Sequence, residues 1–430
     1  MEQISIIADD LTGANDTGVQ FCQHGFRTMV IIDAANVERM GQDKDVWAIN
    51  TDTRHLAAPE AYQRVYEITL KLKKAAISRV YKKIDSTLRG HPGAELEAVM
   101  DAWQADLALV VPAFPANRRL VVDGHLLISE GTETAAASTS LTPGDARTAL
   151  CHIPTVLQGE MGRRVGQINL ATVRQGVKEL VAALEAARTN SQVLVLDAVD
   201  EEDLRNIARA ISRFQRDVIV AGAAGMAAHL PLAWNLKPVP NNPLNKKGAI
   251  LLVAGSRNPV TAAQVQRLAE VSACQAVKVE TEAILTGEPA VEIERVLQEV
   301  TTQDAGAGLI IIAVDSLFQT IDRDRVSNSG SKAIALALGT ITSRLLNMRR
   351  ISALVVTGGD TAVHVCRALE ARGINLAADL LPGIPLGYLE GGRGDGLPIV
   401  TKAGGFGSPD SLIKVNEFLQ QRMKNEMELV

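Results

Sequence analysis

Two aspartates stand side by side close to the N-terminus, directly after a short apolar run. The run is Ile4–Ala8, Asp9 and Asp10 follow it, and small polar residues come next. Ligands of open α/β sheets bind at the carboxyl ends of the strands, so this position suits a binding loop. Adjacent carboxylates can accept hydrogen bonds from a polyhydroxylated ligand, whereas a phosphatase of the haloacid dehalogenase type needs one residue between its two aspartates. The structural alternative is that Asp10 or Thr12 caps the helix that follows.

Charged residues also gather after two further expected strands of the first half. The run Lys82–Gly90 reads Lys-Lys-Ile-Asp-Ser-Thr-Leu-Arg-Gly, and it supplies cations for a carboxylate and one acceptor, Asp85, for a hydroxyl. Arg54 follows the strand expected at Val46–Asn50, and its guanidinium can clamp a carboxylate through two parallel hydrogen bonds. Exposed lysines without a ligand are the alternative. Together with the two aspartates, these strand ends predict a site for a small anionic polyol.

Three glycine-rich turns of the second half each stand between an expected strand and an expected helix. They are Gly255-Ser256, Gly358-Gly359-Asp360-Thr361 and Gly404-Gly405-Phe406-Gly407. Glycine lets backbone N–H groups approach phosphate oxygens, and the N-terminus of a helix favours an anion. A single turn of this kind is more often plain geometry, but three of them in one half predict a polyphosphate site.

Several other kinds of site are not indicated. No segment follows the P-loop pattern, and no G-x-G-x-x-G fingerprint follows an expected strand. The seven histidines show no spacing typical of a metal site, and no Gly-x-Ser-x-Gly is present. The four cysteines are far apart in the sequence, so we expect reduced thiols rather than a zinc site or a disulfide framework.

The apolar pattern predicts the scaffold that would position these residues. Short apolar runs alternate with amphipathic stretches along both halves, which favours βαβ units and mostly parallel sheets. The low aromatic content of 3% agrees with cores of Val, Ile, Leu and Ala. We expect helices at Ala61–Ala76, Val173–Ala187 and Glu201–Arg213. We expect strands at Ile4–Ala8, Val46–Asn50, Arg79–Lys82, Leu107–Pro112, Val193–Asp197, Val218–Ala221, Ala249–Ala254, Gly308–Val314, Ala353–Thr357 and Ile399–Lys402.

A cluster of proline and asparagine residues at 231–247 predicts a linker, because it favours neither helix nor strand. A chain of 430 residues is also long enough for two domains. The prediction is therefore an α/β protein with a first domain at 1–230, a linker at 231–247 and a second domain at 248–430. Each domain is expected to be a mostly parallel sheet flanked by helices, with the active site in the cleft between them. A surface excursion is expected at Ile128–Pro154, and a turn at Gly391–Gly396.

Composition limits the partners that this chain can have. Lys and Arg number 44 and Asp and Glu 49, a formal net charge of −5, and no basic block is interleaved with aromatic residues. A nucleic-acid partner therefore has little support. No apolar run approaches the length of about 18 residues that a membrane span needs, and the N-terminus lacks the pattern of a secretory signal. We expect a cytoplasmic protein with small-molecule ligands and no nucleic-acid or membrane partner, and a homodimer is left open.

Four of these motifs, taken in order, resemble those of the four-carbon acid sugar kinase family. They are Ala8–Gly13, Lys82–Gly90, Thr357–Thr361 and Lys402–Gly407. The similarity spans nearly the whole chain, and the pattern is closest to that of the D-threonate kinases. It implies transfer of the γ-phosphoryl group of ATP to the terminal hydroxyl of a four-carbon sugar acid, namely D-threonate, D-erythronate or 3-oxo-tetronate. Mg²⁺ is expected to bridge the phosphate oxygens.

The resemblance also assigns residues to the two ligands. In the N-terminal domain the acid would be held by Asp9, Arg54, Lys82, Lys83, Ile84 and Asp85. In the C-terminal domain ATP would be held by Ser256, Gly358, Gly359, Asp360, Thr361, Gly404, Gly405 and Gly407. A carboxylate must orient the attacking hydroxyl or accept its proton, and Asp10, Asp85 and Asp360 are the candidates.

The metal ligands stay unknown at this point, and other functions are kept as alternatives. A phosphatase or a dehydrogenase could act on a similar acid. A non-catalytic sugar-acid sensor could share the two-domain architecture. A sensor needs no polyphosphate site, so the three glycine-rich turns count against it.

Overall fold

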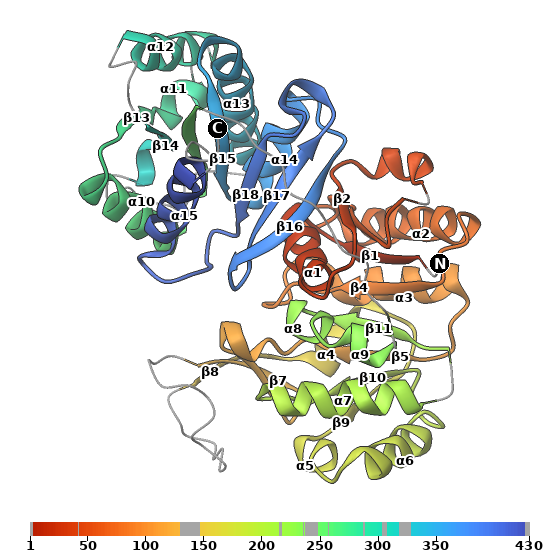
Figure 1. Cartoon of the computed structure of the whole chain (residues 1–430). Helices are drawn as coiled ribbons and strands as arrows, with labels where there is room; N and C mark the ends of the chain where they lie inside the picture. The colour runs from red at the N-terminus through yellow and green to blue at the C-terminus, as the bar shows by residue number, and fades with distance from the viewer. Residues whose placement is uncertain are drawn as a thin grey trace. The chain divides into compact units, whose positions relative to one another are not determined.

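Two units make up the described part of this computed structural model (Figure 1). The first unit combines Met1–Thr28 with Asp33–Pro240, and the second combines Met29–Ile32 with Asn241–Val430. Most of the segment 231–247 lies outside the described residues, and its first residues end the short helix α9 (Leu230–Ala233). The described residues are 3–41, 43–129, 147–214, 217–234, 236, 248–256, 258–286, 289–302, 308–317 and 328–425.

Within the described residues, the first unit contains seven parallel strands of the main sheet. Its strands are nearly continuous apolar runs, and every residue of β1 is buried. This pattern is expected where helices cover both faces of a sheet. β1 lies between β3 and β4, in a register that pairs Ile4 with Val46 and with Arg79. Across the sheet the order is β3 (Val46–Asn50), β1 (Ile4–Ala8), β4 (Arg79–Lys83), β11 (Ile219–Gly222), β5 (Ala108–Val111), β10 (Val193–Leu196) and β9 (Val165–Ile168).

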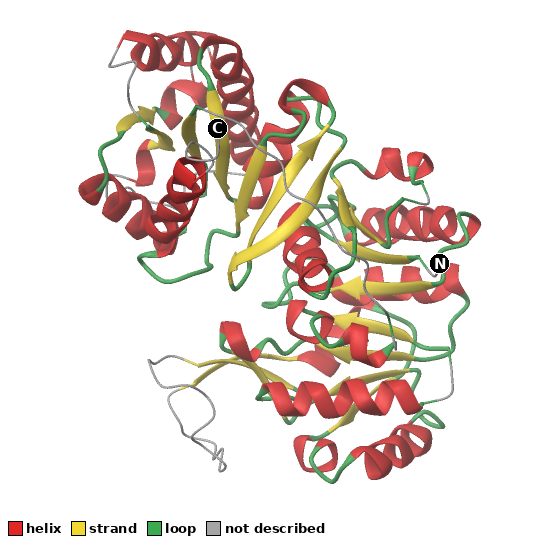
Figure 2. Cartoon of the chain, viewed as in Figure 1, coloured by secondary structure: helices red, strands yellow, loops and turns green. Residues whose placement is uncertain are grey.

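Helices flank this sheet in two layers (Figure 2). One layer holds α2 (Ala58–Lys74), α3 (Pro92–Trp103) and α4 (Ile153–Glu160), which pack in succession. The other layer begins with α1 (Leu11–Gln23), against which α8 (Ala224–Ala227) packs. It continues through α9 to α7 (Glu201–Arg213), α6 (Val177–Ala187) and α5 (Leu170–Val173).

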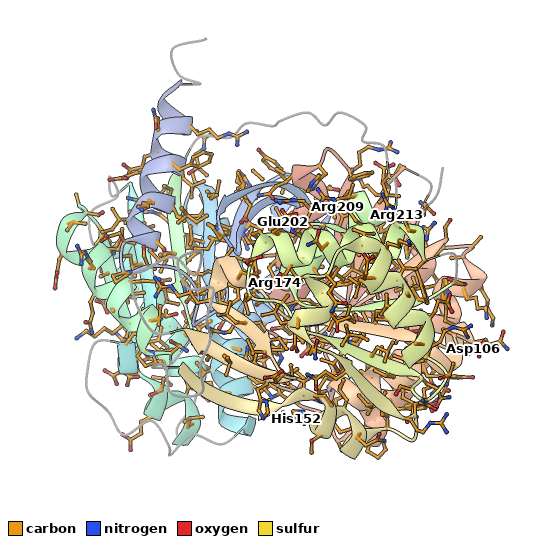
Figure 3. The ribbon with its side chains drawn as sticks, turned by 90° about the horizontal axis from the view of Figure 1, so that it is seen from below. Asp106, His152, Arg174, Glu202, Arg209 and Arg213 are labelled. Atoms are coloured by element: carbon orange, nitrogen blue, oxygen red, sulfur yellow. The ribbon has the colours of Figure 1, made fainter. Side chains whose placement is uncertain are left out.

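A small antiparallel sheet is attached to the first unit. Its strands are β6 (Arg119–Val122), β7 (His125–Ser129) and β8 (Arg147–His152). The segment that we expected to be a surface excursion therefore contains the end of β7 and all of β8, and its middle lies outside the described residues. Elsewhere on this unit, surface charges pair with one another. Glu202 and Arg209 on the outer face of α7 lie 3.1 Å apart, and both are labelled in Figure 3.

The second unit contains a mixed sheet. Five of its described strands are parallel, in the order β13 (Gln275–Val279), β14 (Leu309–Val314), β12 (Ala249–Ala254), β15 (Ile351–Thr357) and β18 (Pro398–Lys402). Two antiparallel strands follow, β17 (Ile384–Glu390) and β16 (Gly373–Leu381). The unit also includes β2 (Thr28–Ile31), a segment of the N-terminal part of the chain that pairs with β16.

The helices of the second unit form two groups. α10 (Pro259–Val271) packs with α15 (Ser411–Asn425). In the other group, α13 (Asn328–Met348) contacts α11 (Thr281–Thr286), α12 (Pro289–Thr302) and α14 (Gly359–Ala368). A short turn connects each of α10 and α14 to the parallel strand before it, so their N-termini lie at the edge of the sheet where ligands of α/β proteins bind.

The predicted α/β class with mostly parallel sheets is confirmed, while some local predictions need correction. The single helix predicted over Val173–Ala187 is interrupted, because Gly176 takes a φ of 108° between α5 and α6. The segment Gly391–Gly396 holds a short 3₁₀ turn, Gly392–Gly394, which connects the antiparallel strands β17 and β18.

Candidate active site

One arginine holds the two adjacent aspartates that follow β1. Nε and Nη2 of Arg54 donate to Oδ2 and Oδ1 of Asp9 at 2.7 and 3.0 Å, which is a two-bond clamp. Its Nη1 donates to Asp10 Oδ2, and its Nη2 lies 3.2 Å from Asp85 Oδ1. The Arg54 side chain is only 10% exposed. The guanidinium therefore joins carboxylates from the ends of β1 and β4, which are neighbouring strands.

Local structure explains why these groups meet. Asp10 is the N-cap of α1, and its Oδ1 accepts a hydrogen bond from Gly13 N at 2.7 Å, so the capping role considered for this residue is confirmed. The loop before Arg54 is tied to the end of β1, because Thr53 N donates to Asp9 O at 3.0 Å. Asp52 turns this loop with a left-handed φ of 54°, a conformation that aspartate tolerates better than most residues.

Asp85 is held by its own loop as well as by Arg54. Its Oδ2 accepts from Thr87 N at 3.0 Å, from Thr87 Oγ1 at 2.5 Å and from Arg89 Nε at 3.0 Å. Nη2 of Arg89 donates to Oδ1 at 2.8 Å. Burial would raise the pKa of Asp85, but Arg54, Arg89 and Lys83 outweigh burial and hold that pKa well below its usual value. This carboxylate therefore stays charged and anchors the loop.

The environment of Asp10 has the opposite effect. Burial raises the pKa of Asp10, the charges of Asp9 and Asp85 add to the rise, and Arg54 and Lys83 oppose it. Two carboxylates of one cluster thus have pKa values that are pushed apart. Such a difference in pKa is typical of pairs in which one carboxyl group exchanges a proton and the other stays charged. Because its pKa is raised, Asp10 is the stronger base of the two.

Lys82 lies inside the unit rather than at its surface. Its side chain is 1% exposed, and its Nζ lies 2.7 Å from Glu95 Oε2 of α3. The same Nζ donates to Lys83 O at 2.7 Å and to Ile7 O at 3.4 Å. Glu95 also accepts from Thr53 Oγ1 at 2.8 Å. Lys82 therefore has three partners inside the protein, namely two carbonyl oxygens and the Glu95 carboxylate, and the buried ion pair ties the end of β4 to α3.

Lys83 has an ammonium group whose hydrogen-bond donors are still available to a ligand. Among the described residues, its Nζ has no hydrogen-bond acceptor, and its ion-pair partner Asp16 Oδ1 is 3.9 Å away. A Cβ added to Gly13 would lie 3.2 Å from Lys83 Nζ and 2.8 Å from Asp10 Oδ1, so the ammonium stands beside the first turn of α1. The next residue, Ile84, is buried and its N–H donates to Gly222 O at 2.8 Å.

The first site therefore offers acceptors and cations close together. Asp9 and Asp10 present carboxylate oxygens, Lys83 presents an ammonium with unused donors, and the Arg89 side chain is 62% exposed. Carboxylates suit the hydroxyls of a ligand, and the cations suit an acid group. This chemistry fits a small polyhydroxylated acid.

The three glycine-rich turns follow β12, β15 and β18, which are neighbours in the sheet of the second unit. The structure brings the turns into contact. A Cβ added to Gly404 would lie 2.2 Å from Ser256 Oγ, and one added to Gly358 would lie 3.4 Å from Ser256 Cβ. A Cβ added to Gly255 would lie 2.2 Å from Thr361 Oγ1. The residues that the sequence singled out in this half therefore form one continuous group.

The glycines of these turns are required for two different reasons. Gly358 and Gly407 have φ angles of 98° and 84°, which a side chain rarely tolerates. Gly404 has no such angle, and what requires glycine there is the close approach of Ser256. A Cβ on Gly405 would meet Asn258 Nδ2 at 3.4 Å, an ordinary contact.

The N-terminus of α14 is suited to an anion. Gly358 is its N-cap and has no side chain to cap the helix. Within the described residues, no acceptor meets the backbone N–H groups of Gly359 and Thr361. Uncapped N–H groups and the helix dipole together attract phosphate. Asp360 lies exposed in the same turn, so this third candidate base belongs to the second unit.

Lys402 ends β18 next to the third turn and is 1% exposed. Its Nζ donates to Ala403 O at 2.7 Å and to Gly404 O at 3.2 Å. No carboxylate forms an ion pair with it in the described parts of the chain. Burial lowers the pKa of Lys402 to about 7.

Across the described ranges, no group of three or more His, Cys, Asp or Glu residues could hold a metal ion. No described helix is both long enough and apolar enough to span a membrane.

Sequence reasoning missed several residues near the first site. Glu95 binds Lys82, and its only sequence signal is an acidic residue on the buried side of an amphipathic helix. Asp16 lies nearest to Lys83 and is buried within α1. Burial lowers the pKa of Arg119 on β6, and the charges of Asp85 and Arg89 also act on it, which puts this arginine near the cluster.

Several known proteins are similar to this chain over nearly its whole length. Residues 4–230 match the family described as a sugar-binding N-terminal domain, and residues 251–412 match a nucleotide-binding C-terminal domain. The D-threonate kinase of Bordetella bronchiseptica is 34% identical, with 97% of this chain and 98% of that protein covered. The D-erythronate kinase of Heliobacterium modesticaldum is 31% identical, with 99% of each chain covered.

A solved structure from Salmonella typhimurium is similar in fold. It is 24% identical to this chain, and the match has a TM-score of 0.76. It covers 96% of this chain and 99% of the solved one. The α/β fold is thus shared with a known structure.

Proposed function

This chain belongs to the four-carbon acid sugar kinase family, and from that premise we propose that it transfers the γ-phosphoryl group of ATP to the 4-hydroxyl of D-threonate. Kinase chemistry with an alcohol as acceptor follows from the family. The identity of the acid, the role of each residue and the use of Mg²⁺ are the parts that we propose.

The observation that carries the proposal is the presence of two unlike sites in one chain. The first unit gathers carboxylates and cations at the ends of β3, β1 and β4. The second unit gathers three glycine-rich turns and an uncapped helix N-terminus at the ends of β12, β15 and β18. A polyhydroxylated acid fits the first site and a polyphosphate fits the second. A sensor of sugar acids would need only the first.

For the acid, we assign the carboxylate group to Lys83, with Arg89 as the second cation. Arg54 was expected to clamp this group, but its nitrogens already bind Asp9, Asp10 and Asp85. Arg54 then serves to hold the carboxylates in place for the hydroxyls of the acid.

Lys82 and Ile84 act from within the unit in this proposal. Lys82 is neutralised by Glu95, and the side chain of Ile84 is 2% exposed. Both would set the position of Lys83 and Asp85, which flank Ile84 in sequence, rather than touch the acid.

For the proton, we assign Asp10 as the acceptor. The oxygen of the 4-hydroxyl attacks the γ-phosphorus while its proton moves to the Asp10 carboxylate. The bond between the γ-phosphorus and the bridging oxygen breaks, and ADP leaves with that electron pair. Asp85 is a poor base, because its pKa is held low and both of its oxygens accept hydrogen bonds from arginine.

For the nucleotide, the proposed contacts are backbone groups of the turns at Gly358–Thr361 and Gly404–Gly407 together with the Ser256 hydroxyl. Mg²⁺ would arrive with ATP and neutralise charge on the phosphate oxygens. It keeps several water ligands in such sites, so few protein ligands are needed and none is assigned here. ATP is a cytoplasmic substrate, and we propose that the protein acts in that compartment.

A coupled assay of ADP release tests the proposal. The purified chain is given ATP and Mg²⁺ with D-threonate, D-erythronate, 3-oxo-tetronate or L-threonate, and kcat/KM is compared. The highest value is expected for D-threonate. A higher value for D-erythronate or 3-oxo-tetronate would replace the substrate but keep the reaction, and binding of the acids without ADP formation would favour a sensor.

A further inference from the structure

The nucleotide-binding unit holds a buried lysine that the proposed reaction does not use. Lys402 is 1% exposed and lies at the last position of β18. We propose that Lys402 is the phosphate-responsive charge of this unit and takes up a proton when the polyphosphate of ATP binds to the three turns. This inference rests on the proposed use of ATP.

Hydrogen bonds tie Lys402 to two of the three turns. Its Nζ donates to the carbonyl oxygens of Ala403 and Gly404 in the third turn, at 2.7 and 3.2 Å. Its own carbonyl oxygen accepts from Gly358 N in the second turn at 2.9 Å. Gly404 in turn packs against Ser256 of the first turn. A charge on Lys402 is therefore placed within reach of any anion that these turns hold.

Among the described residues, no carboxylate pairs with this lysine. Both partners of the Nζ are neutral carbonyls. Thr357, its register partner on β15, has a buried Oγ1 without a hydrogen-bond partner. The titratable or charged residues on nearby elements are Asp360, His364 and Arg367 on α14, Tyr388 and Glu390 on β17, and Asp379 on β16. None of these residues forms an ion pair with Lys402.

Burial and the missing counter-ion together explain why the charge of Lys402 would depend on the binding of ATP. Burial lowers the pKa of Lys402 to about 7. At physiological pH, Lys402 is therefore neutral in a large fraction of the protein molecules. An anion beside the turns favours the protonated form and raises that pKa. Linkage requires the converse as well, namely that protonated Lys402 binds the anion more tightly.

The expected pH dependence follows from this linkage. ATP affinity should fall as pH rises through the pKa of the free protein, and it should level off above the pKa of the complex. A rise of about 2 pKa units on binding corresponds to roughly hundredfold weaker ATP binding at high pH than at low pH. The same rise predicts an uptake of about 0.8 proton per ATP near pH 8.

Calorimetry of ATP binding to the full chain measures this uptake directly. The binding enthalpy is recorded near pH 8 in two buffers with different ionisation enthalpies, and the difference gives the number of protons. The Lys402→Met variant should lose the uptake and the pH dependence of the affinity. The Lys414→Met variant, which changes an exposed lysine on α15 of the same unit, should keep both. The comparison also removes the contribution of the terminal phosphate of ATP, which titrates by itself.

The possible outcomes separate this inference from the proposed function. ATP binding to the unaltered protein without proton uptake would overturn the inference even if Lys402→Met failed to fold. The same uptake in Lys402→Met and in the unaltered protein would also overturn it, since the proton would then belong to another group. No binding of ATP at all would overturn the proposed function, and the role of Lys402 with it. Loss of uptake in Lys402→Met, with D-threonate binding unchanged, supports the inference.

Discussion

Replacing Arg54 by alanine would leave the carboxylates of Asp9, Asp10 and Asp85 together without the cation that joins them. The side chains of Arg54, Asp9 and Asp85 are 10%, 5% and 8% exposed, so solvent screens this cluster little. Removing one partner of a buried ion pair typically costs about 3–5 kcal/mol of unfolding free energy. Lys83 and Arg89 still neutralise part of the charge, and we therefore expect a loss of about 3 kcal/mol near pH 7.

The loss should depend on pH with a definite sign. In the unaltered protein, Arg54 helps to hold the pKa of Asp85 below its unfolded value, a stabilisation that is present above that unfolded value and lost as pH falls. In Arg54→Ala, the crowded carboxylates should have pKa values above their unfolded values, so the variant loses stability as pH rises through them. The difference between the two proteins should therefore be larger near pH 8 than near pH 5.

Urea unfolding followed by tryptophan fluorescence is a suitable assay. The three tryptophans, Trp47, Trp103 and Trp234, all belong to the first unit, so the signal reports the unit that holds Arg54. The matched control is Arg64→Ala, an exposed arginine that donates to the backbone oxygens of Thr51 and Asp52, and it should change stability by about 0.5 kcal/mol or less. A loss for Arg54→Ala no larger than this control, at both pH values, would refute the role of Arg54 as the centre of the cluster.

Two further predictions concern the nucleotide turn and the proton acceptor. Gly404→Ala should weaken ATP binding about tenfold or more in calorimetry, because the new Cβ displaces Ser256. Gly308→Ala, in the same unit but outside the three turns, adds a Cβ that meets no atom within 4 Å and should bind ATP normally. Equal effects of both changes would contradict the role of Ser256. Asp10→Asn should lower kcat about 10²-fold or more in the ADP-release assay with little change in melting temperature, because asparagine still caps α1. Asp33→Asn, at an exposed N-cap away from the cluster, is its control, and full activity of Asp10→Asn would exclude Asp10 as the base.

Much of the scaffold could be predicted because most of its strands can be recognised from apolar runs in the local sequence. β1 and β3 are nearly continuous apolar runs, and their predicted bounds agree with the structure. β16 and β17 were not predicted, since Gly373, Asp379, Pro385 and Gly387 interrupt their apolar pattern. β2 is a plain apolar run whose place in the second unit depends on pairing with β16, more than 300 residues away in sequence, and no local pattern can show such a partner.

The candidate site was predictable in its residue types but not in its pairings. The carboxylates of Asp9 and Asp10 and the cation of Arg54 were recognised from their positions after strands. That Arg54 binds those carboxylates depends on how three strand ends meet in space. Lys82 shows the same limit, because its partner Glu95 lies on a helix and carries no motif.

The central claim is that this chain phosphorylates the terminal hydroxyl of a four-carbon sugar acid. The most direct test is phosphorus–proton correlation NMR of the product formed from D-threonate, ATP and Mg²⁺. The account predicts one new phosphate ester whose phosphorus couples to the two protons on C4, formed in step with ADP. A phosphate on another carbon, or ADP formed without any phosphorylated acid, would contradict it.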